Sequence, residues 1–175
     1  MAVIFQRPES SEYPAYSEPY IAKVPNGDLI KIMQATHRET QAYIGALTDE
    51  QVQYRYAEGK WSIKEIIGHL SDAERIFAYR ALRFARKDTT DLSGFDENVY
   101  VPASNAHNRS IFELLAEFTV VRAATLALLS SFTDEMLLQR GTANGKAVSV
   151  RALAYIICGH EMHHLAVIKE RYIKS

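Results

Sequence analysis

The sequence contains very little cysteine: Cys158 is the only one among 175 residues. A lone cysteine has no intramolecular partner, so the fold does not depend on a disulfide and suits a reducing compartment. Because Cys158 lies inside an apolar stretch, we expect a small buried side chain there. A chain of this length can bury most of an apolar core without a disulfide, so we expect one domain over residues 1–175.

Long apolar runs are also missing. No stretch of about 18 apolar residues occurs, although a helix needs that length to span a bilayer. The first residues, MAVIFQRPESSEYP, lack the basic region and apolar core of a signal peptide. We therefore expect a cytoplasmic protein with no membrane partner.

Neither sign of charge is in excess. Lys and Arg number 20 and Asp and Glu number 21, which gives a formal net charge of −1. This balance produces no long-range field that would attract a phosphate backbone. We expect no nucleic-acid partner.

Proline is scarce after residue 25, because four of the five prolines lie within residues 1–25. Each proline removes a backbone donor and disfavours helix in the residue before it. Residues 1–25 are therefore predicted to form an extended arm. Tyrosines in the arm indicate that it packs along the body of the protein, since disordered tails are usually poor in aromatics.

Apolar residues recur at helical spacing in four later segments. These segments cover about 27–47, 62–86, 110–132 and 149–172, each roughly 20–25 residues long. With no convincing sheet between them, they predict an all-α fold, a four-helix bundle.

Polar residues mark where these helices begin. Asn26 or Asp28 can cap the first helix, and Ser62 opens the second with a capping box. Asn108 is a candidate cap for the third helix, and the fourth starts near Ser149.

Two connections interrupt the helices. Residues 88–108 form a connection of about 20 residues between the second and third helices, and loops of that length are usually functional or disordered. Its segment 94–100 carries acidic and aromatic side chains, which either line a site or belong to an ordinary linker. In the second connection, Asn144-Gly145 favours a tight turn, and a small hairpin between Gln139 and Val148 is expected.

Histidines on the last helix suggest a metal site. In GHEMHHLAVIKERY, His160 and His164 are one helical turn apart and lie within about 20° of the centre of the apolar face. His163 lies about 80° from that centre and is a weaker candidate. Two further histidines have ordinary interpretations: His37 as a core or boundary residue, and His107 as a solvated loop residue.

A third histidine, His69, lies beside the apolar stripe of the second helix, next to Leu70. Burying three imidazoles without partners would cost roughly 1–3 kcal/mol for each unsatisfied group, whereas one metal ion satisfies all three. The sequence therefore predicts one divalent metal ion on His69, His160 and His164, provided that the second and fourth helices adjoin. A metal-free interaction module with hydrogen-bonded histidines remains the alternative.

Asp72, Arg80 and Arg83, which lie near the predicted site, have two interpretations each. Asp72 follows His69 by one turn and is a candidate catalytic residue that accepts a proton or orients a ligand, or else a solvated carboxylate. Arg80 and Arg83 either meet an anionic cofactor or lie on a solvated face. Trp61 is expected to pack the base of the second helix.

These motifs together resemble one family. The Trp61-Ser62 pair, the sequence Gly68-His69-Leu70 and the later HxxxH pair are similar to those of the DinB/YfiT-like superfamily of metalloenzymes, and the resemblance covers nearly the whole chain. It implies a four-helix bundle that holds zinc or nickel between His69, His160 and His164. Imidazole suits zinc, nickel and iron alike, so the residues do not choose the metal.

The resemblance implies several functions, because fold alone does not fix chemistry. Some members transfer bacillithiol, mycothiol or glutathione, one branch isomerises maleylpyruvate, and others are called hydrolases. We expect a thiol S-transferase that uses a low-molecular-weight thiol and a small-molecule electrophile, with a hydrolase using metal-activated water as the alternative. A non-catalytic bundle that self-associates is a further alternative, in which Asp72 or Glu161 completes a closed coordination sphere. A homodimer is implied by the resemblance only.

Overall fold

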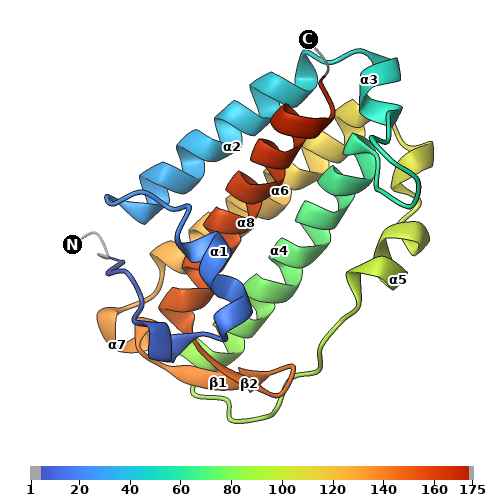
Figure 1. The fold of residues 1–175 in the computed structure, drawn as a ribbon. Helices are drawn as coiled ribbons and strands as arrows, with labels where there is room; N and C mark the ends of the chain where they lie inside the picture. Colours follow the sequence, from blue (N-terminus) through green and yellow to red (C-terminus); the bar gives the residue numbers. More distant parts are fainter. Residues whose placement is uncertain (1–4, 174–175) are drawn as a thin grey trace.

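A computed structural model describes residues 5–173, and four long helices form its bundle (Figure 1). These helices are α2 (Leu29–Gly45), α4 (Ile63–Ala85), α6 (Ile111–Ser130) and α8 (Val150–Arg171). The expected all-helical four-helix bundle is confirmed, and the helix ends differ from the expected ones by one or two residues. Within the described residues, no helix is long and apolar enough to cross a membrane.

Side-chain caps fix where the long helices begin. Asp28, Ser62 and Ser149 each accept a hydrogen bond from a backbone N–H in the first turn of the helix that follows. Ser110, and not Asn108, caps α6, because Ser110 forms a complete capping box. Asn108 instead ends a short 3-10 helix, η3 (Ala106–Asn108).

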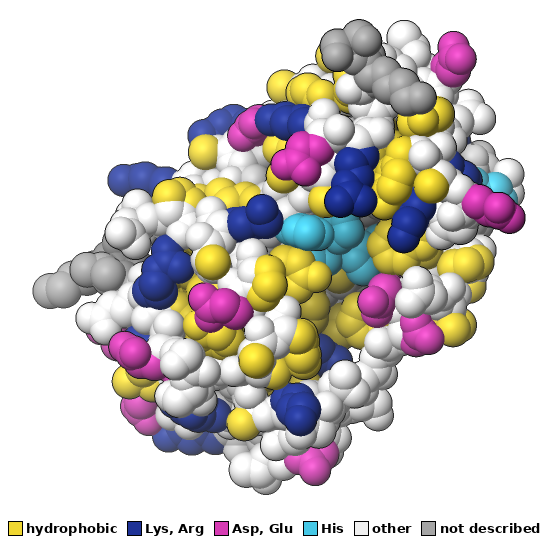
Figure 2. Space-filling model, in the orientation of Figure 1, with side chains coloured by type: hydrophobic (Ala, Val, Ile, Leu, Met, Phe, Trp, Pro, Cys, Tyr) yellow, Lys and Arg dark blue, Asp and Glu magenta, His cyan; other side chains and the backbone are white. Residues whose placement is uncertain are grey.

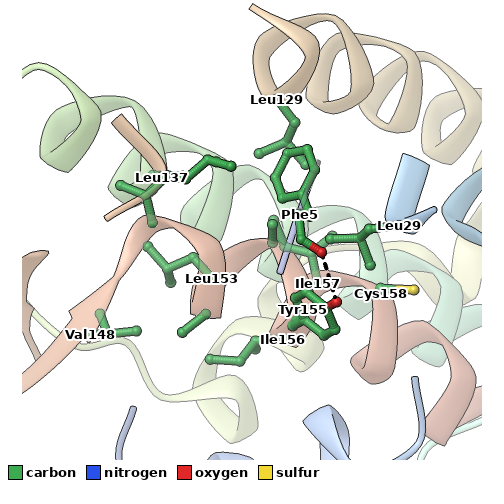
Figure 3. Close-up of a cluster of buried hydrophobic side chains, with 14 of the residues drawn as sticks. Phe5, Leu29, Leu129, Leu137, Val148, Leu153, Tyr155, Ile156, Ile157 and Cys158 are labelled. Atoms are coloured by element: carbon green, nitrogen blue, oxygen red, sulfur yellow. Dashed lines mark hydrogen bonds between the residues drawn. The ribbon is translucent and has the colours of Figure 1, made fainter. Parts of the chain in front are cut away.

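The core lies where α8 meets the other helices (Figure 3). Tyr155 of α8 packs there, and its hydroxyl donates a hydrogen bond to the backbone carbonyl of Phe5 at 3.1 Å. Cys158 is fully buried, as expected, and burial raises its pKa to about 12. The first half of α8 thus anchors the described start of the arm.

The described part of the arm is not simply extended. It contains two 3-10 turns, η1 (Ser10–Glu12) and η2 (Ala15–Ser17), and a one-turn helix, α1 (Glu18–Ile21), that lies against α8 (Figure 1). Proline in the first turn of α1 is compatible with helix because that position needs no N–H. The expectation that the arm packs on the body is confirmed, although residues 1–4 lie outside the described part.

The connection between α4 and α6 also holds more structure than the sequence suggested. A short helix, α5 (Glu97–Ala103), forms there because Asp96 accepts a hydrogen bond from the backbone N–H of Asn98. Before it, Leu92 exchanges two backbone hydrogen bonds of 2.9 Å with the neighbouring hairpin. The connection is therefore held against both α4 and the hairpin.

The hairpin itself is confirmed. Strands β1 (Arg140–Ala143) and β2 (Lys146–Ser149) pair antiparallel, and the Asn144-Gly145 turn has positive φ at both residues. Two short helices complete the chain, α3 (Asp49–Gln53) and α7 (Asp134–Leu137).

Candidate metal centre

Three histidines meet where α4 and α8 pack together. His69 comes from α4, and His160 and His164 come from successive turns of α8. The Nε2 atom of His160 lies 3.1 Å from Nε2 of His69 and 3.1 Å from Nε2 of His164. The structure thus shows that α4 and α8 are neighbours, which the sequence alone could not establish.

The spacing of these nitrogens fits a metal ion. Zinc bound at about 2.0–2.1 Å in a tetrahedron separates two ligand nitrogens by roughly 3.3 Å. Hydrogen bonding satisfies the group less well, because Nε2 of His160 carries either a proton or a lone pair and cannot both donate to one neighbour and accept from the other. A cation satisfies three lone pairs at once.

Burial keeps these imidazoles neutral. Burial lowers the pKa of His69 to about 4 and that of His164 to about 3. Burial, reinforced by the neighbouring histidines, lowers the pKa of His160 well below its usual value. Neutral imidazole is the form that binds metal, so the site is ready for a cation at neutral pH.

Aromatic rings surround the triad. The Trp61 ring lies 4.9 Å from the His69 ring, between centroids, and the Tyr20 ring meets His160 edge-on at 5.3 Å. Trp61 therefore forms a wall of the site and does not simply pack the base of α4 as expected. Phe77 lies about two turns after His69 on the same side of α4, and its ring centroid is 6.1 Å from that of His160.

Two cavities meet at His164 of the triad. The first, here called the Arg80 cavity, has a volume of about 360 Å³ and extends from the three histidines to Tyr16, Phe77 and Arg80. The second, the Arg171 cavity, has a volume of about 350 Å³ and extends to Tyr56, Lys60, Arg171 and Tyr172. Both are lined by Trp61, His163 and His164. Figure 2 shows histidine side chains at the surface of this hollow, with basic and hydrophobic side chains around it.

The segment 94–100 lines the site, which decides between its two interpretations. Gly94, Phe95 and Glu97 line the Arg80 cavity, and Asn98 lines the Arg171 cavity. Tyr100 is exposed and packs on Phe95, with ring centroids 5.4 Å apart.

Neither candidate carboxylate reaches the triad. Asp72 is absent from the lining of both cavities and pairs with Arg75 at 3.5 Å. Glu161 turns away from the triad toward Arg122, at 2.7 Å. Among the described residues, the group able to hold a metal ion contains the three histidines and no carboxylate.

The two candidate arginines of α4, Arg80 and Arg83, differ in their position relative to the cavity. Arg80 is buried and lines the cavity, whereas Arg83 pairs with Asp88 outside it. Of the remaining histidines, His37 is buried against Phe118 and His107 is exposed, as expected for both.

Sequence reasoning missed a buried ion network beside the site. Arg122 of α6 is 2% exposed and binds Glu74 of α4 and Glu161 of α8, each at 2.7 Å. A signal was present, because Arg122 follows Phe118 by four residues and so shares the apolar face of its helix. The network joins the two helices that carry the triad.

A helical bundle with three converging histidines on two adjacent helices defines the class of metal-binding bundles. The family model described as DinB superfamily matches residues 32–168, which include the whole triad. The chain belongs to the DinB superfamily.

Named relatives share much of the chain. It is 28% identical over 131 residues to a protein of Oceanobacillus iheyensis, covering 72% of this chain and 73% of that protein. It is 21% identical over 153 residues to YfiT of Bacillus subtilis, covering 86% and 85%. Both are named "Putative metal-dependent hydrolase".

Solved structures show the same fold. The YfiT structure, described as "a probable metal-dependent hydrolase with an unusual four-helix bundle topology", matches with a TM-score of 0.76 and 17% identity, covering 94% of this chain and 90% of that one. A DinB-like protein of Bacillus subtilis, YjoA, matches with a TM-score of 0.59 and 18% identity, covering 85% and 94%.

Proposed function

We propose that this protein is a metal-dependent S-transferase. In this proposal His69, His160 and His164 hold one divalent transition metal ion, zinc or nickel, and a low-molecular-weight thiol is joined to a small-molecule electrophile beside it. One observation carries the proposal: two cavities of similar volume meet at His164, one of the three metal-binding histidines, which gives room for a separate reactant on each side. The names of the relatives support metal dependence.

A bound metal ion would lower the pKa of a thiol near it toward neutrality. The chain supplies the rest. Trp61 packs on His69 and Tyr20 on His160, and the two cavities position the reactants. During transfer the sulfur forms a bond to carbon, the leaving group departs with its bonding electrons, and the thiol proton passes to solvent.

Hydrolysis is the second candidate, favoured by the names of the relatives. Activation of water usually requires a positioned proton acceptor. Among the described residues that line the two cavities, the only carboxylate is Glu97, and it is exposed. His163 would be the acceptor in that reaction, since it lines both cavities.

A closed, non-catalytic metal site fits less well, because no described carboxylate joins the three histidines. Self-association stays a prediction. The outer face of α6 supports it, since Phe112 and Val120 are 68% and 70% exposed. Light scattering after gel filtration would compare the parent with a Phe112→Ser/Val120→Ser variant.

The test combines metal analysis with turnover. The parent, a His160→Ala/His164→Ala variant and a control His107→Ala variant are dialysed against a weak chelator, and their metal content is measured. We expect about one metal per chain in the parent and control and none in the double variant. Each protein is then mixed with thiols and an electrophile, and conjugate and hydrolysis product are quantified separately. Hydrolysis without thiol consumption would replace the transferase with the hydrolase, and no metal in any variant would reject both.

A further inference from the structure

Arg80 is a buried cation with no counter-ion. Its side chain belongs to a residue that is 7% exposed, and its Nη2 donates one hydrogen bond, to the backbone carbonyl of Ser93 at 2.9 Å. A guanidinium has five N–H donors, so most of them lack a protein acceptor here. Within residues 5–173, no carboxylate forms an ion pair with Arg80, not even Glu97, which lines the same cavity.

The other sheltered arginines are paired. Arg122 is held by Glu74 and Glu161, and Arg151 is held by Glu12. Sheltering a guanidinium without such a partner is unfavourable, because the group loses part of its hydration and gains no opposite charge. Burial accordingly lowers the pKa of Arg80. An arginine kept in this state inside a cavity indicates an anion that enters from outside.

The cavity shows what kind of molecule would bring that anion. His69, Ala73, Phe77 and Arg80 follow one another along a single stripe of α4, and all four line the cavity. The Cα atoms of His69 and Arg80 are eleven residues apart, or about 16 Å along the helix. Between the cationic end and the histidine end lie Ala73, Phe77 and the Tyr20 ring, which give the cavity apolar and aromatic walls. Glu97, close enough to Tyr20 to raise its pKa, is the acidic side chain of the lining.

We propose that Arg80 binds the carboxylate of an elongated, mainly apolar reactant whose reactive end lies at the histidine triad. This inference rests on the proposed S-transferase function and names the class of its reactant. The Arg80 guanidinium carbon lies 5.7 Å from the Phe77 ring centroid, and that centroid lies 6.1 Å from the His160 ring centroid. The cationic group and the triad are therefore less than about 12 Å apart, a distance that a short linear carbon chain can bridge. Bidentate pairing with a carboxylate would use the free N–H groups of the guanidinium.

The Arg171 cavity offers a competing position for an anion. Lys60 and Arg171 line it, but both are exposed. Solvent hydrates and screens these exposed cations, so neither of them needs a bound anion to compensate for burial. The observations therefore favour Arg80, and Arg171 becomes an outcome of the test.

The test uses 6-mercaptohexanoate and its neutral analogue 6-mercaptohexanol with the cobalt-loaded protein. Absorbance from sulfur-to-cobalt charge transfer reports thiol binding and yields a Kd for each probe. We expect the parent to bind the acid about 10-fold more tightly than the alcohol, as one charge-assisted pair provides. Arg80→Gln should lose this preference, Arg80→Lys should retain part of it, and Arg83→Gln, a matched control three residues away, should keep it.

The outcomes separate the inference from the function it rests on. Equal binding of acid and alcohol by the parent, or a preference lost in Arg171→Gln and kept in Arg80→Gln, overturns the role of Arg80 and leaves the thiol site intact. Absence of charge transfer with either probe overturns the S-transferase. In that case the metal-free protein and heptanoate, which carries no thiol, still test Arg80. Heptanoate should raise the Tm of the parent and leave the Tm of Arg80→Gln unchanged. An unchanged Tm of the parent would contradict the inference.

Discussion

Gly159 of α8 lies against the backbone of Tyr20, so that a Cβ atom at residue 159 would be 1.9 Å from the Tyr20 carbonyl oxygen. No side chain can occupy that space without displacing α1. Because Gly159 precedes His160, this contact also sets the Tyr20 ring on the triad.

Gly159→Ala should therefore destabilise the protein by about 1–3 kcal/mol, through overpacking against a backbone that cannot rotate away. Urea denaturation measures the change. Gly45→Ala is the matched control, since a Cβ there would meet only a Leu115 methyl at 3.9 Å. A neutral or stabilising effect is expected for that control, because alanine favours helix over glycine. Equal effects of the two substitutions would refute the close approach of α1.

Trp61 gives the site its own optical probe, because it is the only tryptophan in the chain and lies 4.9 Å from His69. Binding of nickel or cobalt should quench its fluorescence. His69→Ala should weaken binding by more than about 100-fold, since removing even an outer partner of a ligand costs 10–100-fold. A fluorescence titration measures both, and an unchanged titration in His69→Ala would mean that the ion binds elsewhere.

Removing Arg122 should leave two buried carboxylates without a cation. We expect Arg122→Met to lower the free energy of unfolding by about 3–5 kcal/mol. Replacing all three charges, in Glu74→Gln/Arg122→Met/Glu161→Gln, should restore much of this loss because no unpaired charge remains. If the triple variant is less stable than the single one, the network contributes through packing and not through charge.

Glu12 links the arm to the start of α8 and should make stability depend on acid. Burial alone would raise its pKa, but hydrogen bonds from Arg151, the Glu9 backbone and Ser149 lower it to about 2, from an ordinary value of 4.5. A carboxyl whose folded-state pKa is depressed stabilises the fold above its unfolded pKa and loses that contribution as pH falls toward its folded pKa.

The stability of the parent should therefore fall by about 3 kcal/mol more than that of Glu12→Gln between pH 5 and pH 2. Urea denaturation of both proteins at several pH values measures this difference. Parallel pH profiles would show that Glu12 is not ion-paired in solution.

Local patterns explain how much of this fold is predictable from sequence. The capping box at Ser62 and the apolar stripes define helices within one chain segment, so they are visible without tertiary structure. The same is true of His160 and His164, whose spacing places them on one face. His69 required the further knowledge that α4 and α8 adjoin.

Contacts between distant segments explain what was missed. Arg122 and Glu74 are 48 residues apart, and no local pattern shows that they meet. Arg80 and Arg83 look alike in sequence. In the structure, Arg80 lines a cavity that the arm and the 94–100 segment also line, whereas Arg83 pairs with Asp88. The surroundings of the two arginines depend on the conformation of these loops, which the helical periodicity of the sequence does not predict.

The Arg122 network has a consequence for how the site acquires its ion. Glu161 is the immediate neighbour of His160, and Glu74 follows His69 on α4, so Arg122 cross-links the two ligand-bearing helices from within the protein. These protein contacts alone hold the two helices together, so the three imidazoles converge before an ion binds. Metal exchange should proceed without refolding, and the identity of the resident ion should follow which metal is most available to the protein.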